Sequence, residues 1–473
     1  MASESAIAEG GSIVTADQIN YEQKLFSHPS YRMEPQYPNT FGQTISLGTS
    51  QTPVVINIPP EVFNLSQSYI NYTVTLPASA AFTWYARQAL AEISHVQFYS
   101  GNSQWICDLD NLNNYLDITL KKELSQEDFL SLDLSLNNIG ASNVQLNAIP
   151  ALRNSNMTTG NVDNGPGFSS SINYLEPAYF SVSPNATAVT YNVQFNLGKI
   201  KNTVFSIDKN LYFGQTMYLK LYFGPVSKVA YASTGANQPS DGVKSAYLGA
   251  ATIANLVLQL AVESNQSMRA MIINKVSTVG QEYIIPYVQA FKNSNSTGSQ
   301  NISLQLDQGN GRTLVKVYHA PYNSQEQFDT MYDHCNCNNA PPVAGVTPPQ
   351  KVQVYYTQLN GKRNQDININ CTSTAANGPF LDYMSHRRQL RGSILMNANI
   401  YQQNWFHCDD FSDEGPKYDQ KSGSELISGI PMNISPLTWS FVGVTMANLA
   451  FQHYTWCVFT KKLIMQPGQV SVQ

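Results

Sequence analysis

Apolar and polar residues alternate with a period of two along much of the chain. In the run 69–76, Ile70, Tyr72, Val74 and Leu76 alternate with Tyr69, Asn71, Thr73 and Thr75. This alternation is typical of a strand with one face in a core and the other on a surface. Similar runs, bounded by turn residues, occur at 43–60, 190–200, 202–210, 216–225, 255–264, 282–291, 312–321, 351–361, 392–406 and 450–465. Their spacing predicts an all-β chain built from sandwiches.

Helical patterns are rare. In residues 82–93 (FTWYARQALAEI), Tyr85, Leu90 and Ile93 lie near helical spacing among several alanines, so we expect a helix there. A second, short helix is expected at 323–334. Helical content should therefore be low throughout.

A strand-and-turn pattern occurs twice, about 250 residues apart. Val96–Asp117 and Val352–Asn370 both begin with an alternating strand, turn on a Gly/Asn pair and become polar. Gly101 and Asn102 suit a tight hairpin turn, because both residue types tolerate positive φ. The 473 residues are long enough for two cores. We therefore expect two β-domains.

The predicted division follows composition. It has an N-terminal arm at 1–40, a first domain at 41–230, a polar linker at 231–245 and a second domain at 246–473. A long insertion at about 124–190, rich in Asn, Ser and Gly, lies within the first domain. The arm has no core of its own, and we expect it to order only on assembly.

Charged residues make up only 12% of the chain, about half of the ~25% usual in soluble proteins. A freely soluble monomer normally relies on charge to stay apart from its neighbours, whereas a subunit with much buried surface does not. The composition therefore favours an assembly subunit, with a secreted polar β-protein as the alternative.

Several other classes are disfavoured. The net charge is −5 and no basic block is present, so we expect no direct specific nucleic-acid binding. Six cysteines in a chain of this length are too sparse for a disulfide framework. Residues 1–18 lack the basic and apolar regions of a secretory signal, and no run of 18 apolar residues suggests a membrane span.

Two short segments are candidate metal sites. One contains Asp333, His334, Cys335 and Cys337, and the other contains His407, Cys408, Asp409 and Asp410. The Cys-x-Cys spacing is shorter than the usual spacing of zinc ligands. The acidic run 409–414 lacks the spacing of a calcium-binding loop. We therefore predict no metal ligands and no cofactor, and the redox state of Cys335 and Cys337 stays open.

An enzyme or a carbohydrate-binding protein would each need particular side chains. No G-x-S-x-G, P-loop or H-E-x-x-H motif occurs, and no carboxylate pair stands out, so we predict no catalytic or cofactor-binding residues. The basic cluster at 386–391 is interpreted as a solvated or ion-paired face, or as a contact with an anionic neighbour. The tryptophans that could stack on sugars are Trp84, Trp105, Trp405, Trp439 and Trp456. Most lie in strand patterns, where core packing is the commoner role.

Three segments resemble parts of one protein family. They are 82–117 (FTWYARQALAEISHVQFYSGNSQWICDLDNLNNYLD), Phe195–Phe223 and the C-terminal stretch from Met432. Together they are similar to the double jelly-roll major capsid proteins of tailless double-stranded DNA viruses, of the virophage or Polinton-like type. The resemblance extends over about 40–470 and rests on the order of patterns.

The resemblance implies two consecutive eight-stranded jelly rolls and a non-enzymatic, structural role. Such a chain would form a homotrimer with a pseudo-hexagonal outline, and these capsomers would tile an icosahedral shell. Expected partners are neighbouring capsomers and penton and minor capsid proteins, in a virion assembled inside the host cell. A receptor-binding spike and a minor or penton component remain as competing interpretations.

Overall fold

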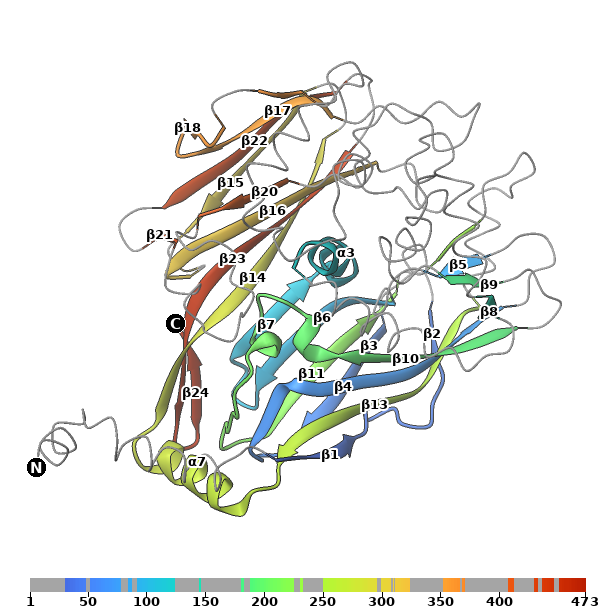
Figure 1. Cartoon of the computed structure of the whole chain (residues 1–473), viewed down its shortest axis with the longest axis vertical. Coiled ribbons are helices and arrows are strands. Elements are labelled where there is room, and N and C mark those ends of the chain that lie inside the picture. Colours follow the sequence, from blue (N-terminus) through green and yellow to red (C-terminus); the bar gives the residue numbers. More distant parts are fainter. Residues whose placement is uncertain are drawn as a thin grey trace, which may run out of the picture.

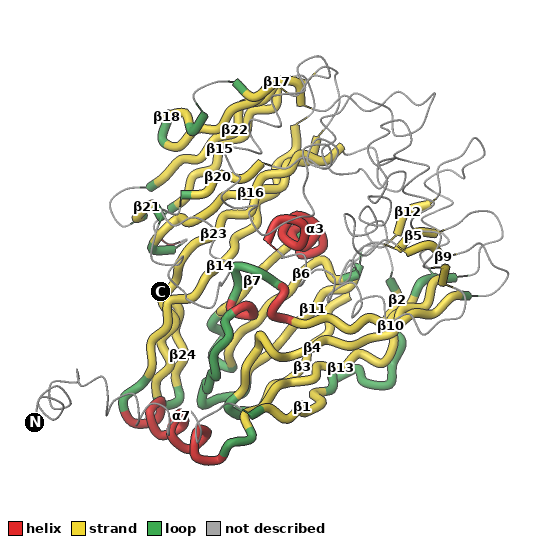
Figure 2. Tube along the Cα trace, in the orientation of Figure 1, coloured by secondary structure: helices red, strands yellow, loops and turns green. Residues whose placement is uncertain are grey.

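The structure is a computed structural model. It describes residues 30–47, 52–77, 84–86, 92–123, 144–145, 180–182, 188–224, 230–232, 250–295, 299–307, 309, 311–323, 352–365, 368–370, 407–411, 429–432, 436–445 and 451–473. These residues form antiparallel sheets with two α-helices, as Figures 1 and 2 show. The predicted all-β class is confirmed.

Two sheets, each with four main strands, form the first jelly roll. Sheet 1 has the order β1 (Tyr31–Gln36), β13 (Thr252–Glu263), β4 (Phe63–Leu76) and β10 (Val189–Asn196). Sheet 2 has the order β3 (Thr52–Ile58), β11 (Met217–Phe223), β6 (Ile93–Ser100) and β7 (Trp105–Asp110). In β11 every second residue is buried, from Met217 to Phe223, so the sequence alternation places one face in the core between the sheets.

The second jelly roll repeats this arrangement. Sheet 3 has the order β14 (Gln281–Asn295), β23 (Phe451–Gln466), β16 (Thr313–Asn323) and β20 (His407–Asp410). Sheet 4 has the order β15 (Ser299–Leu306), β22 (Leu437–Thr445), β17 (Val352–Leu359) and β18 (Lys362–Arg363). Position by position, the strands of sheets 3 and 4 match those of sheets 1 and 2. The predicted double, eight-stranded fold is confirmed.

The two repeated hairpins occupy equivalent places in this order. The strands β6 and β7 end sheet 2, and β17 and β18 end sheet 4. In the second hairpin Asn360 and Gly361 have φ of 50° and 78°, as a two-residue turn requires. The first hairpin differs from the prediction. Its loop is longer, and the positive φ of 63° falls on Ser103.

Shorter elements complete the described chain. The strands are β2 (Ile45–Ser46), β5 (Trp84–Ala86), β8 (Val144–Gln145), β9 (Phe180–Val182), β12 (Ala230–Ala232), β19 (Ile369–Asn370), β21 (Ile430–Pro431) and β24 (Gln469–Val472). The helices are α3 (Leu112–Glu123), α7 (Gln266–Thr278) and the 3-10 turns η2 (Leu197–Lys199) and η3 (Val204–Ser206). In Figure 2, α3 lies between the two rolls and α7 lies at one end of them.

Several local predictions were wrong. Residues Trp84–Ala86, within the predicted helix 82–93, form β5 between β9 and β12, because aromatic residues also suit a strand with partners on both sides. The run 202–210 contains the turn η3 in place of a strand. Both α-helices escaped prediction. The start of α7 had a local signal, since Asn265 caps it by accepting hydrogen bonds from the backbone N–H groups of Ser267 and Met268.

Strand pairing does not follow the predicted domain limits. The first roll includes β1, from the predicted arm 1–40, and β13, from the predicted second domain 246–473. The two rolls are therefore joined through α7, which lies between β13 and β14. The linker prediction was misplaced because a polar composition marks a loop whether or not a domain ends there. Residues 233–245 of the predicted linker lie outside the described residues. So do most of the insertion 124–190, the run 392–406 and all but the first residue of 323–334.

Removing β1 should destabilise the first roll. The backbone N–H of Ser30, just before β1, donates to buried Glu263 at 3.0 Å, and β1 pairs with β13 along its full length. A chain that starts at residue 37 loses this donor and leaves an open strand edge. We expect its free energy of unfolding to fall by about 1–3 kcal/mol or more, measured by denaturant titration. A chain that starts at residue 29 is the control, and equal stability of the two chains would contradict the assignment of β1.

Candidate functional site

The contact between the two rolls is the first candidate site. The two middle strands of sheet 3 are buried on both faces, since residues 314–320 of β16 and 453–460 of β23 are buried without interruption. On one face His453 lies against Phe441 of sheet 4, with ring centroids 5.9 Å apart. On the other face Trp456 lies 5.9 Å from Tyr115 of α3, in the first roll. The middle of the outer face of sheet 3 is therefore covered by the first roll, and we call this contact the seam.

Aromatic rings form the centre of the seam. The Tyr115 ring meets Trp456 and also Tyr318 of β16, in an edge arrangement at 6.1 Å. All three side chains are fully buried. Such pairs contribute about 0.5–1.5 kcal/mol each beyond the burial of their area. The seam therefore resembles a domain core more than a loose contact between domains.

Hydrogen bonds tie the loop between η2 and η3 to the same rings. The Tyr115 hydroxyl donates to the carbonyl oxygen of Lys201 at 2.9 Å, and Asn202 Nδ2 donates to the Tyr115 hydroxyl at 3.2 Å. Asn202 also reaches the Tyr318 hydroxyl at 3.5 Å, across the seam. Its φ of 57° is a left-handed conformation that asparagine tolerates better than most residues.

Lysine side chains lie over two further tyrosines, both in β14. Lys461 lies 3.8 Å from the centroid of the Tyr287 ring, and Lys209 of the first roll lies 5.4 Å from that of Tyr283. Burial, followed by the proximity of Asp110, raises the pKa of Tyr454 to about 12. These tyrosines therefore stay neutral, and the seam combines neutral rings with cation–π contacts. The two rolls are held as one block.

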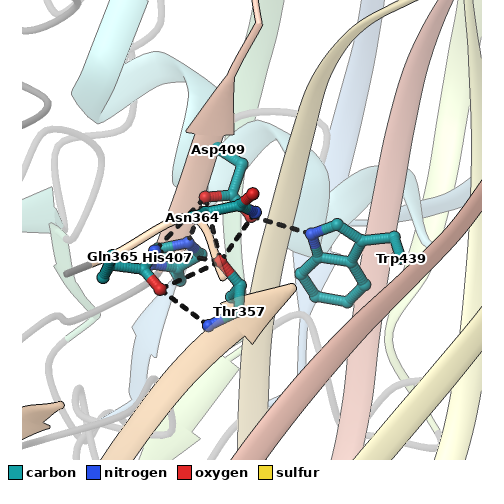
Figure 3. A network of polar contacts seen from close by, with 6 residues as sticks. All are labelled: Thr357, Asn364, Gln365, His407, Asp409 and Trp439. Carbon is teal, nitrogen blue, oxygen red and sulfur yellow. Dashed lines mark hydrogen bonds and ion pairs between the residues drawn. The ribbon is translucent and has the colours of Figure 1, made fainter. Parts of the chain in front are cut away.

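A buried polar network inside the second roll is the next candidate (Figure 3). Asp409 of β20 is 3% exposed and accepts a hydrogen bond from Trp439 Nε1 at 2.8 Å. It also accepts from Thr357 Oγ1 at 3.1 Å and from Asn364 Nδ2 at 3.0 Å, and His407 Nε2 lies 3.0 Å away. A buried carboxylate needs such partners, because desolvation without them is very costly. The network links β20 of sheet 3 to β17 and β22 of sheet 4.

Gln365 completes this network from the loop after β18. Its Oε1 accepts from the Thr357 backbone N–H at 2.7 Å, and its Nε2 donates to Thr357 Oγ1 at 2.9 Å. The loop that follows the repeated hairpin is thus held to the core of the roll.

Two further histidines lie between the same sheets. His319 Nδ1 lies 2.8 Å from Thr455 Oγ1, and His453 Nδ1 lies 3.2 Å from His319 Nε2. Burial, then the proximity of His453 and His407, lowers the pKa of His319 well below its usual value. Burial lowers the pKa of His453 to about 4. Both rings are therefore neutral at pH 7.

Of the candidate metal ligands at 407–410, the structure brings His407 and Asp409 together, with Nε2 and Oδ1 3.0 Å apart. In β20, strand alternation points His407 and Asp409 to one side and Cys408 and Asp410 to the other. The segment 333–337 and the clusters 412–414 and 386–391 lie outside the described residues. Within the described ranges, no group of three or more His, Cys, Asp or Glu side chains could hold a metal ion.

The tryptophans are divided between core and surface. Trp439 and Trp456 are fully buried, whereas Trp105 of β7 is 42% exposed beside Tyr99. Trp405 lies outside the described residues. In the part of the chain that the structure describes, no helix has the length and hydropathy to cross a membrane.

The seam can be tested with two tryptophans. Trp456→Ala removes the ring between Tyr115 and Tyr454, so we expect the free energy of unfolding to fall by about 3–5 kcal/mol. Trp105→Ala, at an exposed ring, should cost less than about 1 kcal/mol and is the matched control. Denaturant titration measures both. Equal effects of the two changes would contradict a tightly packed seam.

Stability should fall in mild acid. Both buried histidines have lowered pKa values in the fold, whereas an unfolded histidine titrates near 6.5. Below pH 6.5 the unfolded state binds more protons, so the free energy of unfolding decreases by up to about 1.4 kcal/mol per pH unit for each histidine. For His453 this decrease continues to about pH 4, and above pH 6.5 it disappears.

Melting temperatures between pH 8 and pH 4.5 test this. His453→Gln should reduce the slope below pH 6.5 relative to the unchanged chain. An unchanged slope would show that His453 does not titrate in this way.

No protein-family model and no curated protein matches this sequence. Solved structures do match it along most of its length. A chain of the Sputnik virophage is 9% identical, with a TM-score of 0.52 over 94% of this chain and 89% of that one. The mavirus major capsid protein is 8% identical, with a TM-score of 0.51 over 93% and 90%. The Faustovirus major capsid protein is 8% identical, with a TM-score of 0.52 over 92% and 90%.

At these identities the similarity concerns the fold. It agrees with the matched strand orders of the two rolls and with the family resemblance of the sequence. The chain has the double jelly-roll fold of the mavirus and Faustovirus major capsid proteins.

Proposed function

We propose that this chain is a major capsid protein. It forms homotrimers whose six jelly rolls give a pseudo-hexagonal outline, and these capsomers tile an icosahedral shell. The observation that carries the proposal is the seam, which holds two equivalent rolls as one block. A block with two equivalent rolls is the unit from which three copies can build six similar positions.

The low charge of the chain supports the same function. A capsomer buries the sides of each subunit against other subunits, and obligate interfaces of this kind often exceed about 2,000 Å². Surfaces that will be buried are depleted in charged residues, because an unpaired charge is costly to desolvate. The content of 12% charged residues fits a chain with a large share of such surface.

The remaining parts of the proposal follow from this role. The chain acts without catalysis and without a cofactor, and its place is the capsid of a virion assembled inside the host cell. Its partners are neighbouring capsomers together with penton and minor capsid proteins. A carbohydrate-binding role is less well supported, since two of its candidate tryptophans, Trp439 and Trp456, are fully buried.

The first test is the mass of the purified chain by light scattering, followed by negative-stain imaging. We expect three chain masses of 52.4 kDa each and particles with a hexagonal outline. A monomer at all concentrations would contradict the proposal and would direct attention to the exposed Trp105 as a binding surface.

A further inference from the structure

One broad face of the first roll carries no charged side chain among its described residues. It is the outer face of sheet 1 over the middle of β4, β10 and β13, and we call it the uncharged face. Its residues are Tyr69, Asn71, Thr73, Thr75, Thr190, Asn192, Gln194, Thr252, Ala254, Val257 and Gln259, all of them exposed or half-buried. Their neighbours along β4, such as Ile70 and Val74, point into the core.

Polar side chains form pairs across the strands of this face. Thr73 Oγ1 donates to Asn192 Oδ1 at 2.9 Å, and the hydroxyls of Thr75 and Thr190 lie 3.1 Å apart. By contrast, the outer face of sheet 2 carries His95, Asp108 and Lys220. The uncharged face is therefore an internally hydrogen-bonded surface that can lose water without burying a charge.

The equivalent face of the second roll is already covered. By strand order, β4, β13 and β10 of sheet 1 correspond to β16, β23 and β20 of sheet 3. In sheet 3 the outer side chains Tyr318 and Trp456 pack against α3 of the first roll. In Figure 1, sheet 1 lies on the side of the first roll away from sheets 3 and 4. Among the described residues, one chain thus covers one of its two equivalent faces.

The contact within the chain is heterologous, because the outer sheet of one roll meets a different surface on the other roll. Repetition of a heterologous contact generates a ring when the rotation closes. The next roll in such a ring must belong to another copy, and it would meet sheet 1 as the first roll meets sheet 3. We propose that the uncharged face binds the second jelly roll of another copy of this chain.

This inference rests on the proposed function and specifies which surfaces meet in the capsomer. The outer faces of sheets 1 and 3 differ in chemistry, and this difference fits burial at different stages, during folding for sheet 3 and during assembly for sheet 1. The outer face of sheet 3 is aromatic and becomes buried as the chain folds. The uncharged face is made largely of Thr, Asn and Gln, so it stays soluble until a second copy arrives.

Matched lysine substitutions test the inference. Asn192→Lys places a charge in the middle of the uncharged face, and Asn57→Lys places the same charge on an exposed position of β3 in sheet 2. We expect Asn57→Lys to form trimers like the unchanged chain. Asn192→Lys should weaken self-association at least about a hundredfold, because it would bury an unpaired charge in the contact. Light scattering over a range of concentrations measures this.

Thr190→Lys is the second variant, and it decides the question if Asn192→Lys fails to fold by circular dichroism. A loss of trimers in either folded variant, with trimers retained in Asn57→Lys, supports the inference. If the folded variants are as trimeric as the unchanged chain, the inference is overturned and the proposed function stands. If the unchanged chain is itself monomeric, the proposed function fails and the inference fails with it.

Discussion

The packing of Trp456 and Tyr318 against Tyr115 fixes where one jelly roll lies relative to the other. Two rolls joined only through α7 could take many relative orientations, and each copy would then present a different outline. Fully buried rings with few rotatable bonds select one of these orientations, and Asn202 adds a hydrogen-bonded link across the seam. The capsid lattice proposed above needs identical units, so its geometry would depend on this contact.

The second roll shows a related constraint inside its core. Asp409 and the histidines His319 and His453 occupy places where apolar residues would pack with less desolvation. The hydrogen bonds of Asp409 connect β20, β17 and β22, so a slipped strand register would leave a buried charge without partners. His319 and His453 fit this core only in their neutral form. The stability of the second roll therefore depends on pH.

Much of the fold could be predicted from the sequence, since period-2 alternation identifies strands such as β4, β11 and β23. The doubling of the fold could be predicted from the two similar hairpin sequences that begin at Val96 and Val352. In the structure both hairpins occupy the last positions of equivalent sheets. Trp84–Ala86, within the predicted helix 82–93, form a strand because strand pairing overrode local helical spacing. The seam could not be predicted, because Tyr115 and Trp456 lie 341 positions apart and no local pattern joins them. The network around Asp409 was hidden for the same reason.

Duplication within one chain also changes how a ring of rolls can assemble. A covalent link makes the contact between two rolls intramolecular. In the proposed six-roll ring, half of the contacts would therefore form at high effective concentration during folding. Those contacts can be aromatic, because they are never exposed to other chains once the fold is complete. The remaining contacts of the proposed ring would form between folded chains, and they must avoid both charge and large apolar area. A contact formed during folding favours aromatic residues, and sheet 3 has tyrosines and a tryptophan on its outer face. A contact formed between folded chains favours uncharged polar residues, and the equivalent face of sheet 1 has threonines and asparagines.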